Sequence, residues 1–149
     1  RDMLRRHTQL EFERIPSSGA LHYLKGDLYV PHKHNLFCIE VKNYKDSHFN
    51  DKIFTSKSNQ FVKWWSKICK QAQAGEQEPL LFFKYNRSKI FVATTRKPKV
   101  CKRYMNVNWV GAYVLLAEDW LELEKVEFTN GDKVYRPWEP DSEWELIDS

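Results

Sequence analysis

Hydrophobic residues recur along the chain with two periods, one typical of strands and one of helices. Over residues 10–15, apolar and charged side chains alternate, which predicts a first β-strand. Two further apolar runs, residues 28–30 and 36–42, are separated by the polar segment 31–35, which has the composition of a turn or short loop. The pattern therefore predicts a strand followed by a β-hairpin.

The longer period predicts a helix over residues 58–74, which ends before Gly75. Its apolar stripe consists of Phe61, Trp64, Trp65, Ile68, Cys69 and Ala72. We interpret this stripe as core or subunit interface, with base stacking by Trp64 or Trp65 as the alternative. A row of lysines on another side of the helix, either a track for a phosphate backbone or an ordinary solvated face, consists of Lys63, Lys67 and Lys70.

The remaining elements are less regular. We expect a helix over residues 1–7, a loop over 16–20, strands over 79–85 and 89–95 joined at 86–88, a strand over 109–116, a short helix over 117–123 and an extended segment over 133–138. This order of elements predicts an α/β or α+β fold built on one sheet.

Charged residues on the predicted hairpin can assemble a site. Because side chains alternate along a strand, Glu40 and Lys42 share one face, and Val41 points to the other. If the two runs pair antiparallel about residues 33–34, Asp27 lies opposite Glu40. Two facing carboxylates, with the Val41 carbonyl nearby, offer the oxygen ligands that Mg²⁺ prefers.

The Glu-x-Lys triplet has a simpler interpretation as well. Chance alone produces such a triplet in about half of chains of this length. The sequence contains no other acidic-x-Lys triplet, and Glu40-Val41-Lys42 lies in an apolar segment where charged residues are costly to place. An exposed amphipathic edge strand is the alternative to a catalytic strand.

Composition limits the classes of protein that fit. The 149 residues are enough for one domain with a proper core, and no apolar stretch approaches the roughly 20 residues that span a membrane. We expect a soluble, intracellular protein of the cytoplasm or nucleoid. Three widely spaced cysteines argue against a disulfide framework or zinc knuckle. His32 and His34 are not expected to bind the metal, because no third ligand is near them and Mg²⁺ prefers oxygen ligands to imidazole nitrogen.

Charge is segregated along the chain. Residues 42–103 contain 15 Lys or Arg and 4 acids, whereas residues 118–149 contain 11 acids and 3 bases. The basic middle is typical of a surface that binds nucleic acid, although a solvated basic face fits the composition equally well. For the acidic tail we consider a solubilising segment, a self-association element or a partner contact.

The motifs resemble those of the PD-(D/E)xK nuclease superfamily, and most of all the archaeal-type Holliday junction resolvases, which phages also encode. The resemblance is based on the segments Arg14-Ile15-Pro16-Ser17-Ser18-Gly19, Gly26-Asp27-Leu28 and Cys38-Ile39-Glu40-Val41-Lys42, and on the helix around Trp64 with the strand after it. It implies a restriction-endonuclease-like core, a mixed central β-sheet flanked by helices, over residues 1–96. Residues 97–149 would be a C-terminal extension with an acidic tail, packed on the same domain.

The resemblance also implies roles for individual residues. Asp27 and Glu40 would bind a divalent metal, Lys42 would act at the attacking water or the scissile phosphate, and Ser17 or Ser18 would lie near the junction. We expect Mg²⁺ with Val41 as a further ligand, Mn²⁺ as a substitute, and Ca²⁺ to support DNA binding more than turnover. Family members also use a Glu on the first helix, and here that residue either precedes Arg1 or is absent.

The expected partner is DNA, four-way or otherwise branched, cut by a homodimer because paired symmetric cuts need two active sites. The candidate DNA-binding residues are Arg14, Lys45, Lys52, Lys57, Lys63 and Lys67. Three alternatives stay open: another nuclease of the superfamily that nicks, cuts flaps or acts as a restriction enzyme, a catalytically inactive DNA-binding module, and a protein-interaction domain.

Overall fold

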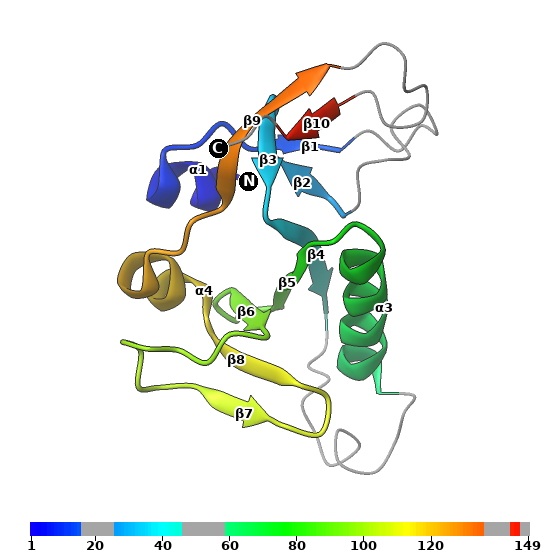
Figure 1. The fold of residues 1–149 in the computed structure, drawn as a ribbon. Coiled ribbons are helices and arrows are strands. Elements are labelled where there is room, and N and C mark those ends of the chain that lie inside the picture. Colours follow the sequence, from blue (N-terminus) through cyan, green and yellow to red (C-terminus); the bar gives the residue numbers. More distant parts are fainter. Residues whose placement is uncertain (16–25, 46–58, 136–143, 147–149) are drawn as a thin grey trace.

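The fold is centred on a mixed seven-stranded β-sheet (Figure 1). The computed structural model describes residues 1–15, 26–45, 59–135 and 144–146. In spatial order the strands are β1 (Glu13–Arg14), β2 (Leu28–Tyr29), β4 (Phe37–Tyr44), β5 (Glu78–Tyr85), β6 (Phe91–Thr94), β8 (Ala112–Leu116) and β7 (Met105–Val107). Only β4 and β5 are parallel, and every other neighbouring pair is antiparallel. This is the mixed central sheet that the resemblance implies.

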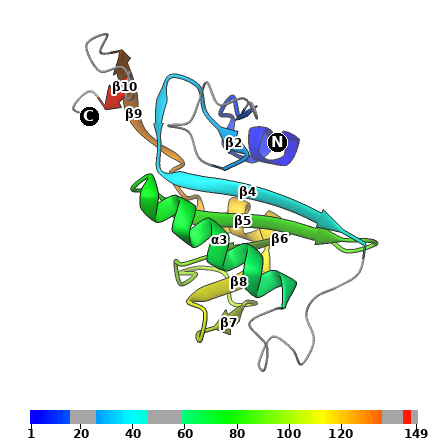
Figure 2. The same cartoon turned by 90° about the vertical axis from the view of Figure 1, so that its right-hand side faces the viewer.

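One face of the sheet is covered by helix α3 (Gln60–Ala74), which lies along β4 and β5 (Figure 2). The helix begins at Asn59, whose side-chain oxygen accepts hydrogen bonds from the backbone N–H groups of Phe61 and Val62. The buried residues of α3 pack on this face of the sheet and are Phe61, Trp64, Trp65, Ile68 and Ala72. The apolar stripe is therefore core, which removes it as support for a subunit interface.

The opposite face is covered by three short elements: α1 (Asp2–Thr8), α4 (Ala117–Asp119) and the π-helical turn η2 (Trp120–Glu124). Their apolar side chains form a second cluster in which Trp120 contacts the rings of Phe37, Phe82 and Phe128. Figure 1 shows α1 and α4 on one side of the sheet and α3 on the other. The sheet is thus covered on both faces, as the α/β interpretation requires.

A second, three-stranded sheet corrects two expectations. It contains β3 (Lys33–Asn35), β9 (Thr129–Tyr135) and β10 (Trp144–Leu146) in the order β10-β9-β3. The expectation of one sheet is therefore wrong, and the segment 31–35 is only partly a turn. The Asn35 side chain accepts a hydrogen bond from Val30 N and donates to Val30 O, which closes the turn and leaves β3 free to pair with β9.

Most other expectations differ from the structure only in their limits. The first strand is shorter than predicted, and the strand expected over 109–116 begins at Ala112 because residues 108–111 form the turn after β7. The hairpin of β5 and β6 and the short helix after Leu116 are confirmed. The predicted loop 16–20 lies outside the described residues.

Residues beyond 96 contribute β7 and β8 to the same central sheet. The boundary at residue 96 stays a prediction. None of the helices in the described ranges is long and apolar enough to cross a membrane.

Candidate active site

Asp27 lies beside Glu40 because β2 and β4 pair in the predicted register. Leu28 is the partner of Ile39, so the next pair along the hairpin is Asp27 and Glu40. The backbone N–H of Asp27 donates to the Ile39 carbonyl at 2.6 Å, and the Asp27 Oδ2 accepts from the Val41 N–H at 2.7 Å. These two bonds attach Asp27 to the residues on either side of Glu40 and fix its carboxylate at this point of β4.

Gly26 makes this close approach possible. Its φ is +90°, and a Cβ at this position would lie 2.5 Å from the Ile39 carbonyl oxygen and 3.0 Å from the Ile39 nitrogen. Only glycine adopts this conformation readily and leaves room for the backbone of β4. The sequence motif includes Gly26 but does not indicate its role. The only feature of the sequence that could have revealed this role is the position of a glycine directly before Asp27.

Glu40 and Lys42 project together from the face of β4 that α3 covers. The Lys42 Nζ lies 3.3 Å from the Glu40 Oε1, and Glu40 is only 9% exposed. A carboxylate this deeply buried is costly unless a cation compensates it, and the Lys42 ammonium group supplies that charge. Farther along the same face, the ring of Tyr44 packs against Trp64 at 5.0 Å between centroids.

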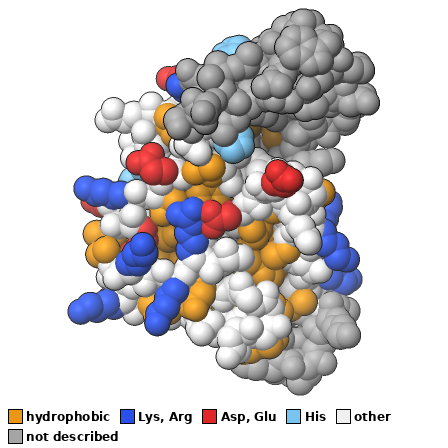
Figure 3. Space-filling model, in the orientation of Figure 1, with side chains coloured by type: hydrophobic (Ala, Val, Ile, Leu, Met, Phe, Trp, Pro, Cys, Tyr) orange, Lys and Arg blue, Asp and Glu red, His pale blue; other side chains and the backbone are white. Residues whose placement is uncertain are grey.

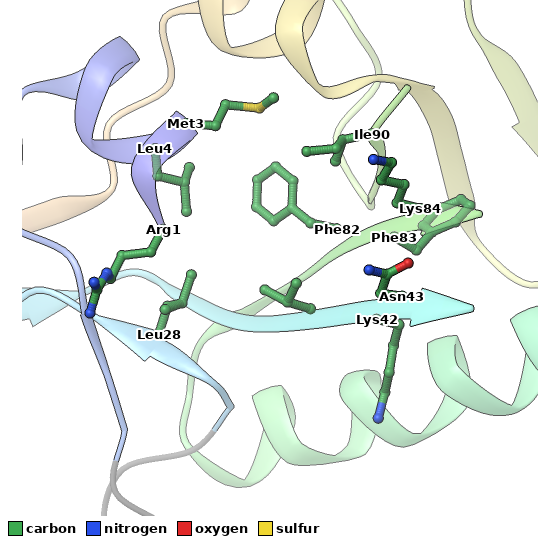
Figure 4. A pocket seen from close by; sticks show the side chains of 11 residues that line it. Arg1, Met3, Leu4, Leu28, Lys42, Asn43, Phe82, Phe83, Lys84 and Ile90 are labelled. Atoms are coloured by element: carbon green, nitrogen blue, oxygen red, sulfur yellow. The ribbon is translucent and has the colours of Figure 1, made fainter. Parts of the chain in front are cut away.

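Val41 points to the other face of β4 and is 44% exposed. There it lines a mainly apolar pocket of about 150 Å³ between α1 and the sheet, together with Leu4, Leu28 and Phe82 (Figure 4). Figure 4 shows the Lys42 side chain pointing away from this pocket, toward α3. The pocket and the charged pair thus lie on opposite sides of one strand.

The oxygen groups at this point fit a hard divalent cation. Asp27 and Glu40 supply two carboxylates from neighbouring strands, and the Val41 carbonyl is on the strand segment between Glu40 and Lys42. Mg²⁺ is commonly held by one or two carboxylates and retains several waters, so this set is sufficient for it. Among the described residues no group of three His, Cys, Asp or Glu side chains is close enough to hold a metal.

A third carboxylate from the first helix is therefore not found among the described residues. Asp2 is exposed, with its carboxylate 4.0 Å from Arg1. Glu13 forms an ion pair with Arg5, and Glu11 is exposed.

The other candidate residues lie elsewhere on the described part of the chain or outside it. Arg14 is exposed on β1, Lys45 is exposed after the end of β4, and Lys63 and Lys67 are exposed on α3. Ser17, Ser18, Lys52 and Lys57 lie outside the described residues. The structure thus brings together Asp27, Glu40, Val41 and Lys42, and their catalytic and metal-binding roles stay predictions.

Comparison with known proteins shows to which family this chain belongs. The family model described as "Phage putative PDDEXK endonuclease" matches residues 1–130. The chain is also 32% identical over 140 residues to "Protein D14" of Escherichia phage T5, an alignment that covers 85% of this chain and 88% of that protein. No solved structure matches the chain. The chain belongs to this phage endonuclease family, and so to the PD-(D/E)xK superfamily.

Proposed function

We propose that the protein is a Mg²⁺-dependent endonuclease that hydrolyses phosphodiester bonds in branched DNA, in the manner of a Holliday junction resolvase. Membership of an endonuclease family supports cleavage of a phosphodiester backbone. The observation that supports the site is the attachment of the Asp27 carboxylate to Val41 N–H, directly beside the Glu40 and Lys42 pair. The combination of two carboxylates and one ammonium group matches what this reaction needs.

Hydrolysis requires an oriented water and stabilisation of the charge that develops on the phosphate and the leaving oxygen. Asp27, Glu40 and the Val41 carbonyl would hold the cation, which when bound supplies Lewis-acid polarisation of the phosphate and a water of lowered pKa. Since an ammonium nitrogen has no lone pair to accept the proton of the water, the Lys42 ammonium group would either orient the water by donating a hydrogen bond to it or neutralise the phosphorane. Its distance of 3.3 Å from Glu40 is compatible with both roles.

Branched DNA is the substrate class that the surface favours. A junction is recognised by shape and phosphate backbone more than by bases, and lysines are the residues that contact phosphates most simply. The exposed Lys63 and Lys67 on α3 and Lys45 after β4 fit this mode of binding. Paired symmetric cuts would need two active sites and hence two copies of the chain.

A catalytically inactive DNA-binding module is the second candidate. It is favoured by one observation, the lack of a third carboxylate near Asp27 and Glu40 within the described residues. In that case the protein would bind the same DNA without cutting it.

One experiment tests both candidates. Labelled four-way, nicked, flap and linear DNA are incubated with the protein in Mg²⁺, in Mn²⁺ and in EDTA. We expect paired nicks on the four-way substrate with Mg²⁺ or Mn²⁺, and none with EDTA. Cleavage of flaps or linear duplex instead would assign another activity of the superfamily, and binding without cleavage would assign the inactive module.

Point variants test the site itself. Asp27→Asn and Glu40→Gln should each lower the cleavage rate about 100-fold or more while DNA binding persists, because each removes one charged oxygen ligand. Glu11→Gln is the matched control, since Glu11 is exposed and lies outside the site. Cleavage at the normal rate by both site variants would exclude this metal site.

A further inference from the structure

The loop after β6 carries a dense group of cations that the proposed site does not use. Five of the eight residues from 96 to 103 are Lys or Arg. Arg96 is neutralised, because its guanidinium binds both Glu78 carboxylate oxygens and stacks over Phe37 at 4.9 Å. The other four, which are exposed and form no ion pair within the described part of the chain, are Lys97, Lys99, Lys102 and Arg103.

Glu124 holds the backbone of this basic loop in place. Its Oε1 accepts from Lys99 N at 2.6 Å, and its Oε2 accepts from Val100 N and Cys101 N, each at 2.7 Å. Burial raises the pKa of this carboxyl, but the three backbone N–H groups lower it by more, so the carboxylate stays charged. Two residues of the loop itself, Pro98 and Cys101, are buried. The cations therefore project from a fixed backbone.

The basic loop lies on the opposite face of the sheet from the proposed site. Cys101 packs with Trp120 and Leu121 in the cluster beneath α4, whereas Glu40 and Lys42 project on the face that α3 covers. Along the strands, Thr94 pairs with Leu80, which pairs with Ile39, so the loop leaves the sheet near the start of β4. Arg96, two residues after Thr94, is level with Phe37, which is five residues of β4 from Lys42. Together with two strand spacings, this places the start of the loop roughly 20 Å from Lys42.

The charge around the basic loop favours an anionic partner. The sequence contains no Asp or Glu between Pro79 and Ala117. Glu118 and Glu122 on the neighbouring helical segment are exposed but form no ion pair with the loop. In Figure 3 blue side chains gather at the lower left, on the side where the connection between β6 and β7 lies in Figure 1.

We infer that the basic loop binds the phosphate backbone of a second DNA arm, one that leaves the branch away from the cleavage site. The inference rests on the proposed function, because it adds a second contact to the same substrate. Duplex DNA has a persistence length of about 150 base pairs, so one straight duplex does not bend around both faces of a sheet within roughly 20 Å. Two arms of a branched molecule reach both faces without bending.

The test is the salt dependence of DNA binding, measured in Ca²⁺ by fluorescence anisotropy. One variant combines Lys97→Gln, Lys99→Gln, Lys102→Gln and Arg103→Gln. A control with the same change of net charge combines Arg6→Gln, Lys84→Gln, Arg87→Gln and Lys89→Gln, which are all exposed. The substrates are a four-way junction with 15-base-pair arms and a 30-base-pair linear duplex.

We expect the loop variant to lose affinity for the junction, with the slope of log affinity against log salt falling by about 3 to 4, because each lost phosphate contact lowers it by about 0.9. The linear duplex should be bound nearly as well as by the control. An equal loss on the linear duplex would overturn the assignment to a second arm. An unchanged slope on the junction would overturn the contact altogether.

Failure of the proposed function can be told apart from failure of this inference. If the protein cleaves no DNA in Mg²⁺, the endonuclease proposal fails, whereas the binding measurement in Ca²⁺ needs no cleavage. If cleavage of the junction occurs but the loop variant binds as the control does, only the second contact is excluded.

Discussion

At the scale of single residues, the position of Asp27 depends on a glycine as much as on charge. Gly26 has a φ of +90°, and a Cβ added to it would lie 2.5 Å from the Ile39 carbonyl oxygen. Gly111 has a similar φ of +73°, but a Cβ there meets no atom within 4 Å. Substitutions at these two positions can therefore distinguish the effect of backbone strain, which both share, from that of close packing, which only Gly26 has.

We expect Gly26→Ala to lower the free energy of unfolding by about 1–3 kcal/mol or more and to abolish DNA cleavage, because the new methyl group pushes Asp27 away from β4. Gly111→Ala, the control, should cost only about 1 kcal/mol of strain and leave cleavage intact. Urea unfolding and the cleavage assay measure the two effects. Normal cleavage by Gly26→Ala would show that cleavage does not require Asp27 to be held at this position beside β4.

The sequence predicts some residue contacts and not others for a physical reason. Asp27 meets Glu40 because antiparallel pairing across a short loop requires only a count of residues from the loop centre. Glu124 was not predicted because its partners are three backbone N–H groups 23 to 25 residues away. Backbone groups are the same in every residue, so such a contact leaves no pattern in the sequence.

At the scale of elements, local hydrophobic periodicity predicts helices and hairpins, whereas the pairing of strands that are distant in the sequence is not predictable from it. Helix α3 and the hairpin of β5 and β6 were predictable because their apolar spacing and turns are local. The sequence does not predict strand β3, because its partner β9 begins more than ninety residues later. Likewise, the stripe on α3 did not indicate whether it packs on its own sheet or on another subunit, since both require the same residues.

Trp65 tests the assignment of that stripe to the core. It is 1% exposed, and its Nε1 donates to the Val110 carbonyl at 2.8 Å. We expect Trp65→Ala to lower the free energy of unfolding by about 3–5 kcal/mol, and Trp65→Phe to cost less because most of the ring volume stays. The measurement is urea unfolding at several protein concentrations.

The concentration dependence decides between core and interface. If Trp65 is core, the cost of Trp65→Ala is the same at every protein concentration. A midpoint that rises with concentration in the wild type but not in Trp65→Ala would instead place this side chain in a subunit interface.

At the scale of the whole molecule, opposite charges are separated along the chain. The net charge of +4 combines a basic middle with an acidic end, and residues 136–149 alone contain five acids and one base. An acidic segment near a DNA-binding surface repels the phosphate backbone and competes for the same cations. The net charge of the protein therefore understates the attraction that its basic surfaces could exert.

Neutralising part of the tail should therefore speed up DNA binding. The variant Glu139→Gln, Asp141→Asn and Glu143→Gln raises the net charge by three, and we expect its association rate with DNA at 50 mM salt to rise about threefold or more. The gain should vanish near 1 M salt, where the Debye length is about 3 Å. Stopped-flow fluorescence with labelled DNA measures both rates.

The control for this variant must have the same net charge with the acids removed elsewhere. Glu11→Gln, Glu76→Gln and Glu127→Gln meet this condition, because all three residues are exposed and none lies within residues 136–149. A smaller gain in the control would mean that the tail acts through its position, close to the DNA path. Equal gains would mean that only net charge matters, and slower association of the tail variant would contradict repulsion and indicate that the tail contributes to the DNA-binding surface.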